Sequence, residues 1–155
     1  MKSKTKNQTQ AFTIIEVVLV LAVAGLIFLI VFQALPRLQA SRRDNARKRD
    51  AELMVSAIID HASNIGRLPT KPELASAISG SGGLADYMQG FKDPSTGQAY
   101  TVVNAATPSD GQINYAPAWL CNSSRTAIES TPGASGQGGF IIGLERGTYC
   151  LDASL

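Results

Sequence analysis

The chain has few of the residue types that build catalytic or metal sites. Among its 155 residues there are one histidine and two cysteines, and only 17% of the residues are charged. The histidine, His61, has no second ligand at metal-binding spacing. No catalytic triad pattern, phosphate-binding loop, paired-cysteine zinc motif or dinucleotide signature is present. We therefore expect neither an enzyme nor a protein with a cofactor.

Polar residues are also scarce in one long segment near the N-terminus. From Phe12 to Phe32 the only polar side chains are those of Thr13 and Glu16. At 1.5 Å per helical residue the segment measures about 31 Å, the thickness of one hydrocarbon core. A carboxylate costs roughly 2.5–3.5 kcal/mol at the bilayer centre, so Glu16 is expected to have a functional partner. Residues 12–35 are predicted to form a membrane-spanning helix.

The segment before this helix looks removable. Residues 1–11 carry three lysines and no acidic residue. A secretory signal has a shorter apolar region followed by a small-residue cleavage site, whereas residues 33–36 (Gln-Ala-Leu-Pro) make a poor site of that kind. We expect cleavage after Ala11 instead, which retains the helix and creates a charged amine at Phe12.

This N-terminus resembles that of type IV prepilins. The resemblance is carried by Ala11, Phe12, Thr13 and Glu16 between a basic leader and an apolar helix, although many family members have glycine where Ala11 stands. It implies cleavage by a prepilin peptidase, N-methylation of Phe12, and polymerisation on an inner-membrane assembly platform into an extracellular pilus. It also implies that Glu16 of one copy neutralises the Phe12 amine of the next, so the main partner of the chain is itself.

Two alternative functions remain open. A pseudopilin of a type II secretion or competence system has the same N-terminus, and residues 93–100 loosely resemble the turn region of some pseudopilins. A signal-anchored surface protein that binds a ligand or DNA as a monomer belongs to another class. This second alternative predicts an uncleaved chain and a dispensable Glu16.

A helical pattern continues beyond the apolar segment. Apolar residues recur at three- and four-residue spacing through residues 53–65, so one long helix is expected to end at Gly66. Its second half is residues 36–65. Gly25 and Pro36 are its weak points, and Pro36 should kink the helix because proline removes one backbone hydrogen bond.

Residues 66–155 are expected to form a small α+β head. Thr70 and Glu73 fit a capping box that starts a short helix. Three or four strands are predicted, at residues 99–103, 112–116, 140–144 and 148–152. Residues 122–139 are predicted to be a loop. The predicted fold is α+β, with a small antiparallel sheet packed on the second half of the long helix, which resembles a type IV pilin.

Cys121 and Cys150 are the only cysteines. In a chain sent across a membrane, a lone pair favours one disulfide, and two buried free thiols are the alternative. The bond would stabilise the fold by roughly 3–4 kcal/mol in the chain-entropy model. The pilin resemblance implies the same bond, as the boundary of the C-terminal region.

Charge is distributed unevenly along the chain. Residues 33–50 contain six basic and two acidic residues, a net +4, whereas residues 51–155 carry a net −4. A solvated basic face that contacts anionic lipid head groups is expected at Arg42, Arg43, Arg47, Lys48 and Arg49. Nucleic-acid contact is possible, but no interleaved aromatic residues support it. Both flanks of the apolar segment are basic, so the distribution of positive charge does not place the head outside. That placement depends on the cysteines, on the Gly/Ser/Thr-rich C-terminal region and partly on the resemblance.

Two minor patterns have ordinary explanations. Asp93, Thr96 and Asp110 offer oxygen ligands for calcium, but EF-hand spacing is missing and a turn at residues 93–97 is the better interpretation. Asn122-Ser123-Ser124 is an N-glycosylation sequon, which matters only in a host with the machinery.

Overall fold

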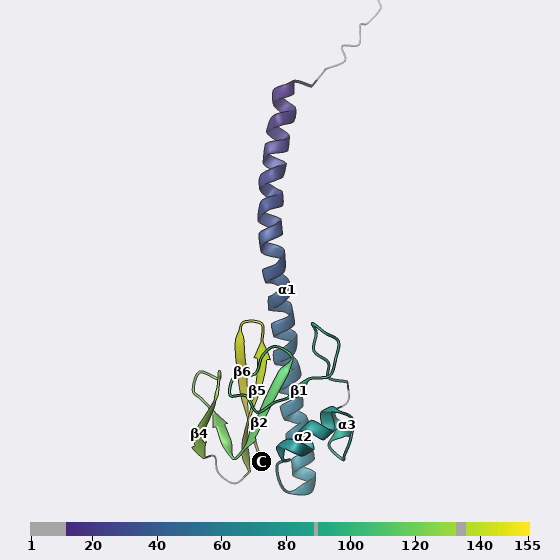
Figure 1. Ribbon diagram of the computed structural model, residues 1–155, viewed down its shortest axis with the longest axis vertical. Helices are drawn as coiled ribbons and strands as arrows, with labels where there is room; N and C mark the ends of the chain where they lie inside the picture. The colour runs from purple at the N-terminus through teal and green to yellow at the C-terminus, as the bar shows by residue number, and fades with distance from the viewer. Residues whose placement is uncertain (1–11, 89, 133–135) are drawn as a thin grey trace, which may run out of the picture. The chain divides into compact units, whose positions relative to one another are not determined.

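The computed structural model describes residues 12–88, 90–132 and 136–155. The chain divides into two compact units, with the boundary between Gln39 and Ala40, and each unit is described by itself. Helix α1 (Ile14–Ile65) contributes its first part to one unit and its second part to the other (Figure 1). Gly25 and Pro36 both lie inside α1, so neither residue ends the helix.

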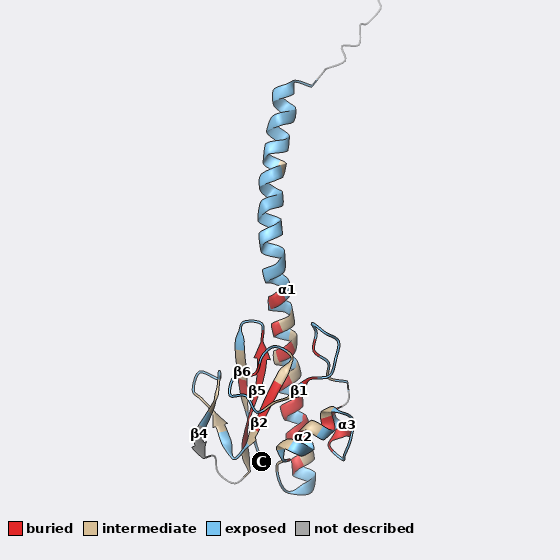
Figure 2. Cartoon of the chain, in the orientation of Figure 1, coloured by how far each residue is buried: buried red, intermediate tan, exposed pale blue. Residues whose placement is uncertain are grey.

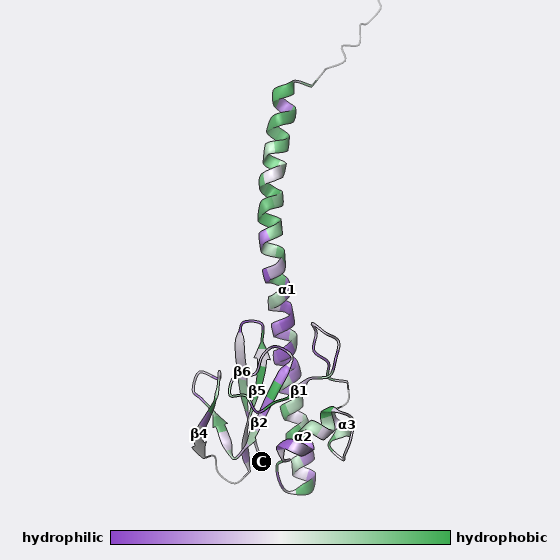
Figure 3. Ribbon diagram, in the orientation of Figure 1, coloured by the Kyte–Doolittle hydropathy of each residue, from purple (hydrophilic) through white to green (hydrophobic). Residues whose placement is uncertain are grey.

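The described part of the first unit is a bare apolar helix. Between Phe12 and Leu38 the large apolar side chains are 49–85% exposed. Figure 2 shows this part of α1 almost entirely as exposed surface, and Figure 3 shows the same part as predominantly hydrophobic. Its length and composition suit a single membrane span, with a mean hydropathy of 3.2 over its best 18-residue window. A membrane anchor and a signal sequence both fit this finding.

In the second unit α1 has one buried face. The buried residues follow the three- and four-residue spacing of a single helix face. They are Ala40, Asp44, Arg47, Ala51, Met54, Val55, Ala57, Ile58 and Ala62. The helix ends at Ile65 as predicted, because Gly66 adopts a φ of +75° and donates its N–H to the Ala62 carbonyl at 2.8 Å.

Two short helices follow, α2 (Lys71–Ile78) and α3 (Ala85–Met88). The predicted role of Glu73 at the start of α2 is confirmed. Its carboxylate accepts hydrogen bonds from the N–H of Thr70 at 2.7 Å and from the Thr70 hydroxyl at 3.0 Å. Arg67 forms a salt bridge to the same carboxylate at 2.6 Å, and this bond holds the pKa of Glu73 at about 2.

The main sheet has four strands in the order β1-β2-β5-β6. The strands are β1 (Thr101–Val102), β2 (Gln112–Pro117), β5 (Gln137–Leu144) and β6 (Gly147–Ser154). The last three pair antiparallel, which confirms the predicted α+β fold. The first pairs parallel with β2, so the sheet is mixed rather than purely antiparallel. A pattern within one strand does not encode the direction of its neighbour, which depends on the path of the connecting loop.

The prediction of a loop over residues 122–139 was wrong. Strands β3 (Trp119–Cys121) and β4 (Ile128–Pro132) form a separate two-stranded sheet, and β5 already begins at Gln137. The connection is tightened by Asn122, whose Oδ1 accepts the N–H of Thr126 at 2.8 Å and that of Ala127 at 3.2 Å. These bonds form a side-chain turn that closes the connection between the two strands. The same turn also occupies the Asn122 amide of the glycosylation sequon, whose Nδ2 donates to the Thr126 hydroxyl at 3.2 Å.

The core lies between α1 and the main sheet (Figure 2). Its fully buried large apolar side chains include Met54, Ile58, Leu74, Ile113, Tyr115, Phe140 and Ile142. The Tyr115 hydroxyl has no hydrogen-bond partner among the described residues. By contrast, the Tyr100 hydroxyl donates to Asp50 Oδ2 at 2.7 Å. Of these two tyrosine hydroxyls, that of Tyr100 is hydrogen-bonded and that of Tyr115 is not bonded to any described residue.

The loop before β2 packs directly on β5 at Gly143. A Cβ atom built on Gly143 would lie 1.8 Å from the backbone oxygen of Ser109. Asp110 forms an isolated parallel bridge to the same glycine. Only a residue without a side chain permits this approach.

Candidate functional site

The predicted assembly residues lie at the start of α1, in the first unit. Ala11 lies outside the described residues. Phe12 is 82% exposed, and Glu16 is an exposed residue in the first turn of the helix. The two side chains line one surface depression together with Val17, Val20 and Leu21. An exposed carboxylate one turn from Phe12 is placed to accept a cation from outside the chain, and the helix dipole favours an acid in this turn.

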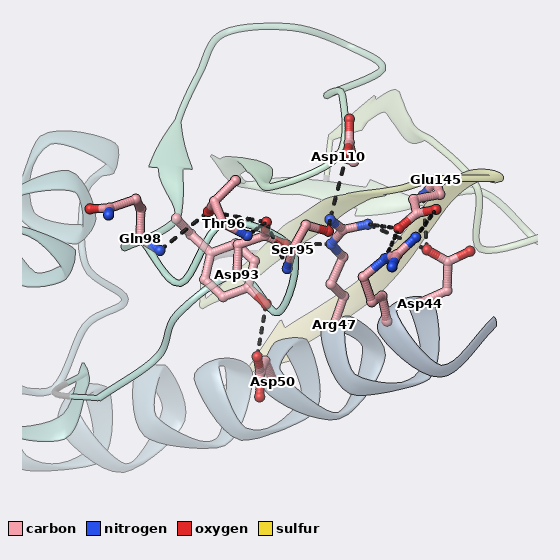
Figure 4. A network of polar contacts seen from close by, with 11 residues as sticks. Asp44, Arg47, Asp50, Asp93, Ser95, Thr96, Gln98, Asp110 and Glu145 are labelled. Carbon is pink, nitrogen blue, oxygen red and sulfur yellow. Dashed lines mark hydrogen bonds and ion pairs between the residues drawn. The ribbon is translucent and has the colours of Figure 1, made fainter. Parts of the chain in front are cut away.

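Arg47 does not lie on a solvated basic face, which corrects the prediction for this residue. Its side chain is completely buried. Figure 4 shows the polar contacts of its guanidinium. Nε donates to Asp93 Oδ1 and Nη2 to the Ser95 hydroxyl, both at 2.6 Å, while Asp44 Oδ1 lies 3.5 Å from Nη1. Burial by itself lowers the pKa of Arg47, but the bond to Asp93 together with the charges of Asp93, Asp110 and Glu145 outweighs burial and raises this pKa above its ordinary value.

Asp93 organises the turn that follows it and so has the predicted turn role. Its Oδ2 accepts the N–H groups of Ser95 at 3.3 Å and Thr96 at 3.2 Å, and the Thr96 hydroxyl at 3.3 Å. Burial alone would raise the pKa of Asp93, but the Arg47 and Thr96 donors outweigh it and hold this pKa below its usual value. Within residues 12–88, 90–132 and 136–155, no group of three or more metal-binding side chains is found.

The tip of the β5–β6 hairpin is tied to α1 beside this buried pair. Arg43 forms a two-point ion pair with Glu145, and the N–H of Glu145 donates to Asp44 Oδ1 at 2.8 Å. The bond to Arg43 lowers the pKa of Glu145. Glu145 and Asp110 also lie 3.8 Å and 3.6 Å from the Arg47 guanidinium. Four carboxylates thus surround two arginines, which fixes the hairpin and the Asp93 turn on one helix face.

The other three residues of the predicted basic face are Arg42, Lys48 and Arg49, and among the described residues only one of them contacts an aromatic ring. Lys48 lies over the ring of Tyr149, with Nζ 5.5 Å from the ring centre. Arg42 and Arg49 are exposed, as predicted. In the part of the chain that the structure describes, neither forms an ion pair. Of the five basic residues, one is therefore buried, two are partly exposed and contact other side chains, and two are exposed.

Cys121 and Cys150 form a disulfide, as predicted, with their Cα atoms 5.7 Å apart. The bond joins β3 to β6 and so connects the two sheets. Two hydrogen bonds support the junction. The N–H of Cys121 donates to Asp152 Oδ1 at 2.7 Å, and the N–H of Cys150 donates to the Arg125 carbonyl at 2.8 Å.

Sequence reasoning missed the acidic partners of Arg47. The sequence patterns do not single out Asp44 or Glu145, and they present Asp93 as a turn residue or a calcium ligand rather than as the partner of an arginine. One signal was present: position 47 lies four residues before Ala51 and seven before Met54, on the helix face that becomes buried. A cation at such a position requires interior carboxylates.

Comparison of the chain with protein-family models, with curated proteins and with solved structures found no match. The functional argument therefore depends on the residues described above.

Proposed function

We propose that the chain is a structural subunit of a type IV pilus. It is inserted as a single-pass membrane precursor, cut after Ala11 by a prepilin peptidase, and polymerised by an inner-membrane platform into an extracellular filament. One observation supports this most strongly. The first part of α1 exposes its large apolar side chains around an isolated carboxylate, that of Glu16.

An apolar helix surface of this size requires a cover. Lipid supplies the cover for the membrane precursor, and neighbouring helices supply it in a filament core. Lipid offers no partner for the Glu16 carboxylate, whereas a bundle of processed helices offers a charged amine. The Phe12 amine of one copy, which stays cationic after N-methylation, is the counter-charge for Glu16 of the next. An unpaired charge in such a bundle costs on the order of 3–5 kcal/mol.

The second unit suits the outside of such a filament. Its Cys121–Cys150 disulfide is typical of proteins that fold outside the reducing cytosol. Its core is closed between α1 and the sheet, so the unit does not need the filament to bury its own apolar residues. In the proposed filament this unit forms the outer surface.

Mass spectrometry of the N-terminus tests the processing step. Protein recovered from sheared surface filaments should begin at Phe12 and carry a methylated amine. The leader peptide, with its three lysines, should be absent. Filaments whose subunits still begin at Met1 would contradict the proposal.

A Glu16→Ala variant tests the assembly step. If the helix is only an anchor, removal of the carboxylate improves membrane insertion by a few kcal/mol at most. If the helix assembles, the variant should accumulate as processed membrane protein with sharply fewer filaments. Thr13→Ala, the other polar residue of the segment, is the matched control and should assemble normally. Normal filament yield from fully processed Glu16→Ala protein would show that this carboxylate does not direct assembly.

A pseudopilin of a secretion or competence system is the second candidate. It is favoured by the turn that starts at Asp93, whose side chain is tied both to its own loop and to α1. The two candidates share processing and the role of Glu16. They differ in product, because a pilus extends far from the cell surface and a pseudopilus stays short. Electron microscopy of cells that produce the chain at its natural level separates them.

A further inference from the structure

A row of charged side chains lies on the exposed face of α1 in the second unit. With 3.6 residues per turn, Arg42, Arg49 and Asp60 fall within about 20° of one line along the helix, and Glu52 lies about 80° away. All four residues are exposed. Leu53, which lies between Arg49 and Asp60 in the sequence and about 20° from the line through Arg42, is 50% exposed. We call this row, with Leu53, the outer stripe.

The charges of the outer stripe are not used by the fold of this chain. Within residues 12–88, 90–132 and 136–155, the side chains of Arg42, Arg49 and Asp60 form no ion pair. Glu52 only accepts a hydrogen bond from the Tyr149 hydroxyl at 3.3 Å. Arg43 and Arg47, by contrast, each have a carboxylate partner.

The outer stripe is separated by sign. Its basic residues precede its acidic ones, and the distance from Arg42 to Glu52 nearly equals that from Arg49 to Asp60. Both distances correspond to three helical turns, about 16 Å. If a second parallel copy is shifted by this amount, both of its arginines lie level with the two acids of the first copy. Without a shift, Arg42 faces Arg42 and Asp60 faces Asp60, which is unfavourable.

We propose that the outer stripe binds a second copy of this chain, staggered by about three helical turns. The inference rests on the proposed function, because copies in one membrane share one chain direction, which leaves the parallel arrangement. Each copy then offers its basic end to one neighbour and its acidic end to another. Such a contact joins two different surfaces of the chain and does not form a closed ring, so it can repeat from copy to copy along a filament. The isolated ion pairs are weak, and their effect is to select the stagger rather than to supply the affinity.

Cross-linking in cell membranes tests the stagger with the full-length chain. A variant with Arg49→Cys and Asp60→Cys is treated with a short thiol-specific bifunctional reagent. The native disulfide does not react with it, and the two new thiols of one chain are too far apart for a direct disulfide. The expected product is a ladder that extends beyond the dimer. Arg49→Cys alone, the control for an unshifted arrangement, should give little dimer.

Charge reversal tests the chemistry of the partner. Arg49→Glu and Asp60→Lys should each reduce filament yield at least about threefold, the factor that one exposed ion pair typically supplies. The variant with both changes should recover most of the yield. Asp86→Lys, at an exposed position of α3, is the matched control and should have no effect. An anionic lipid or nucleic acid as the true partner would make Arg49→Glu harmful and Asp60→Lys harmless, which would overturn the proposal.

The two proposals fail in different ways. Filaments that form normally while the Cys pair yields no ladder, or while Arg49→Cys alone cross-links efficiently, would overturn the staggered contact and leave the pilus intact. A ladder that stops at the dimer would indicate an antiparallel or closed pair and also overturn it. A ladder in membranes that never yield filaments would support the contact and contradict the pilus.

Discussion

Removal of Arg47 is the perturbation that tests the buried ionic cluster most directly. In the folded chain the Arg47 guanidinium makes two hydrogen bonds of 2.6 Å, one to Asp93 and one to Ser95, without contact with solvent. In Arg47→Met the replacement preserves most of the apolar stem but removes the charge. Asp93, whose side chain is 3% exposed, then stays buried with only the weaker donors of its own turn.

The expected cost follows from that geometry. Breaking a buried ion pair on one side typically destabilises a protein by about 3–5 kcal/mol, because the remaining charge lacks compensation. A domain of this size has a total stability of about 5–15 kcal/mol, so Arg47→Met should remove a substantial fraction of the stability of the second unit. The double variant Arg47→Met with Asp93→Asn should recover most of the loss, because it removes both charges and leaves an acceptor for the turn.

The pH dependence should change sign between the parent and the variant. In the parent the pKa of Asp93 is depressed, so its contribution is complete above the unfolded pKa, about 3.9, and is lost as the pH falls through the lower folded value. In Arg47→Met the raising effect of burial is no longer opposed by the guanidinium. Stability should then rise as the pH falls from 7 towards 4, since the folded state takes up the proton first.

Urea unfolding of the detergent-solubilised chain measures these quantities. Trp119, the only tryptophan, reports on the two-stranded sheet through its fluorescence. Arg47→Lys is the matched control. It retains the charge but not the fork of donors, and should cost about 1.5–3 kcal/mol. If Arg47→Met lies within about 1 kcal/mol of the parent and shows the parent's acid profile, the buried pair does not stabilise the fold as argued.

Two further predictions use matched pairs within the core. Tyr100→Phe should cost about 1.5–3 kcal/mol because it removes the hydroxyl that donates to a carboxylate of α1, whereas Tyr115→Phe should be neutral or stabilising by up to about 1 kcal/mol. Equal losses in thermal or urea unfolding would contradict the difference in hydrogen bonding. Gly143→Ala should cost about 3 kcal/mol or more because its Cβ would overlap a backbone oxygen. Gly83→Ala, whose nearest neighbour would be 3.8 Å away, should change the unfolding free energy by less than about 0.5 kcal/mol.

Local patterns determined much of this chain without reference to its tertiary structure. The apolar run defines the first part of α1, and Gly66 marks the end of the helix because only a left-handed residue completes it there. The capping residues of α2 were also readable, since their partners lie three residues apart. In each case the interaction that decides the structure is made between residues close in the sequence.

The tertiary structure decided which charges are buried and how the strands pair. Arg47 and Arg49 look alike in the sequence, but Arg47 lies on the face covered by the Asp93 turn and Arg49 on the face left open. The partners that bury Arg47 lie 46 or more residues away along the chain, apart from the nearby Asp44. The parallel pairing of β1 with β2 depends on the path of the loop that connects these two strands, which the pattern of neither strand encodes. Periodicity describes one element at a time, whereas the burial of a charged side chain and its partners depend on the element that packs against it.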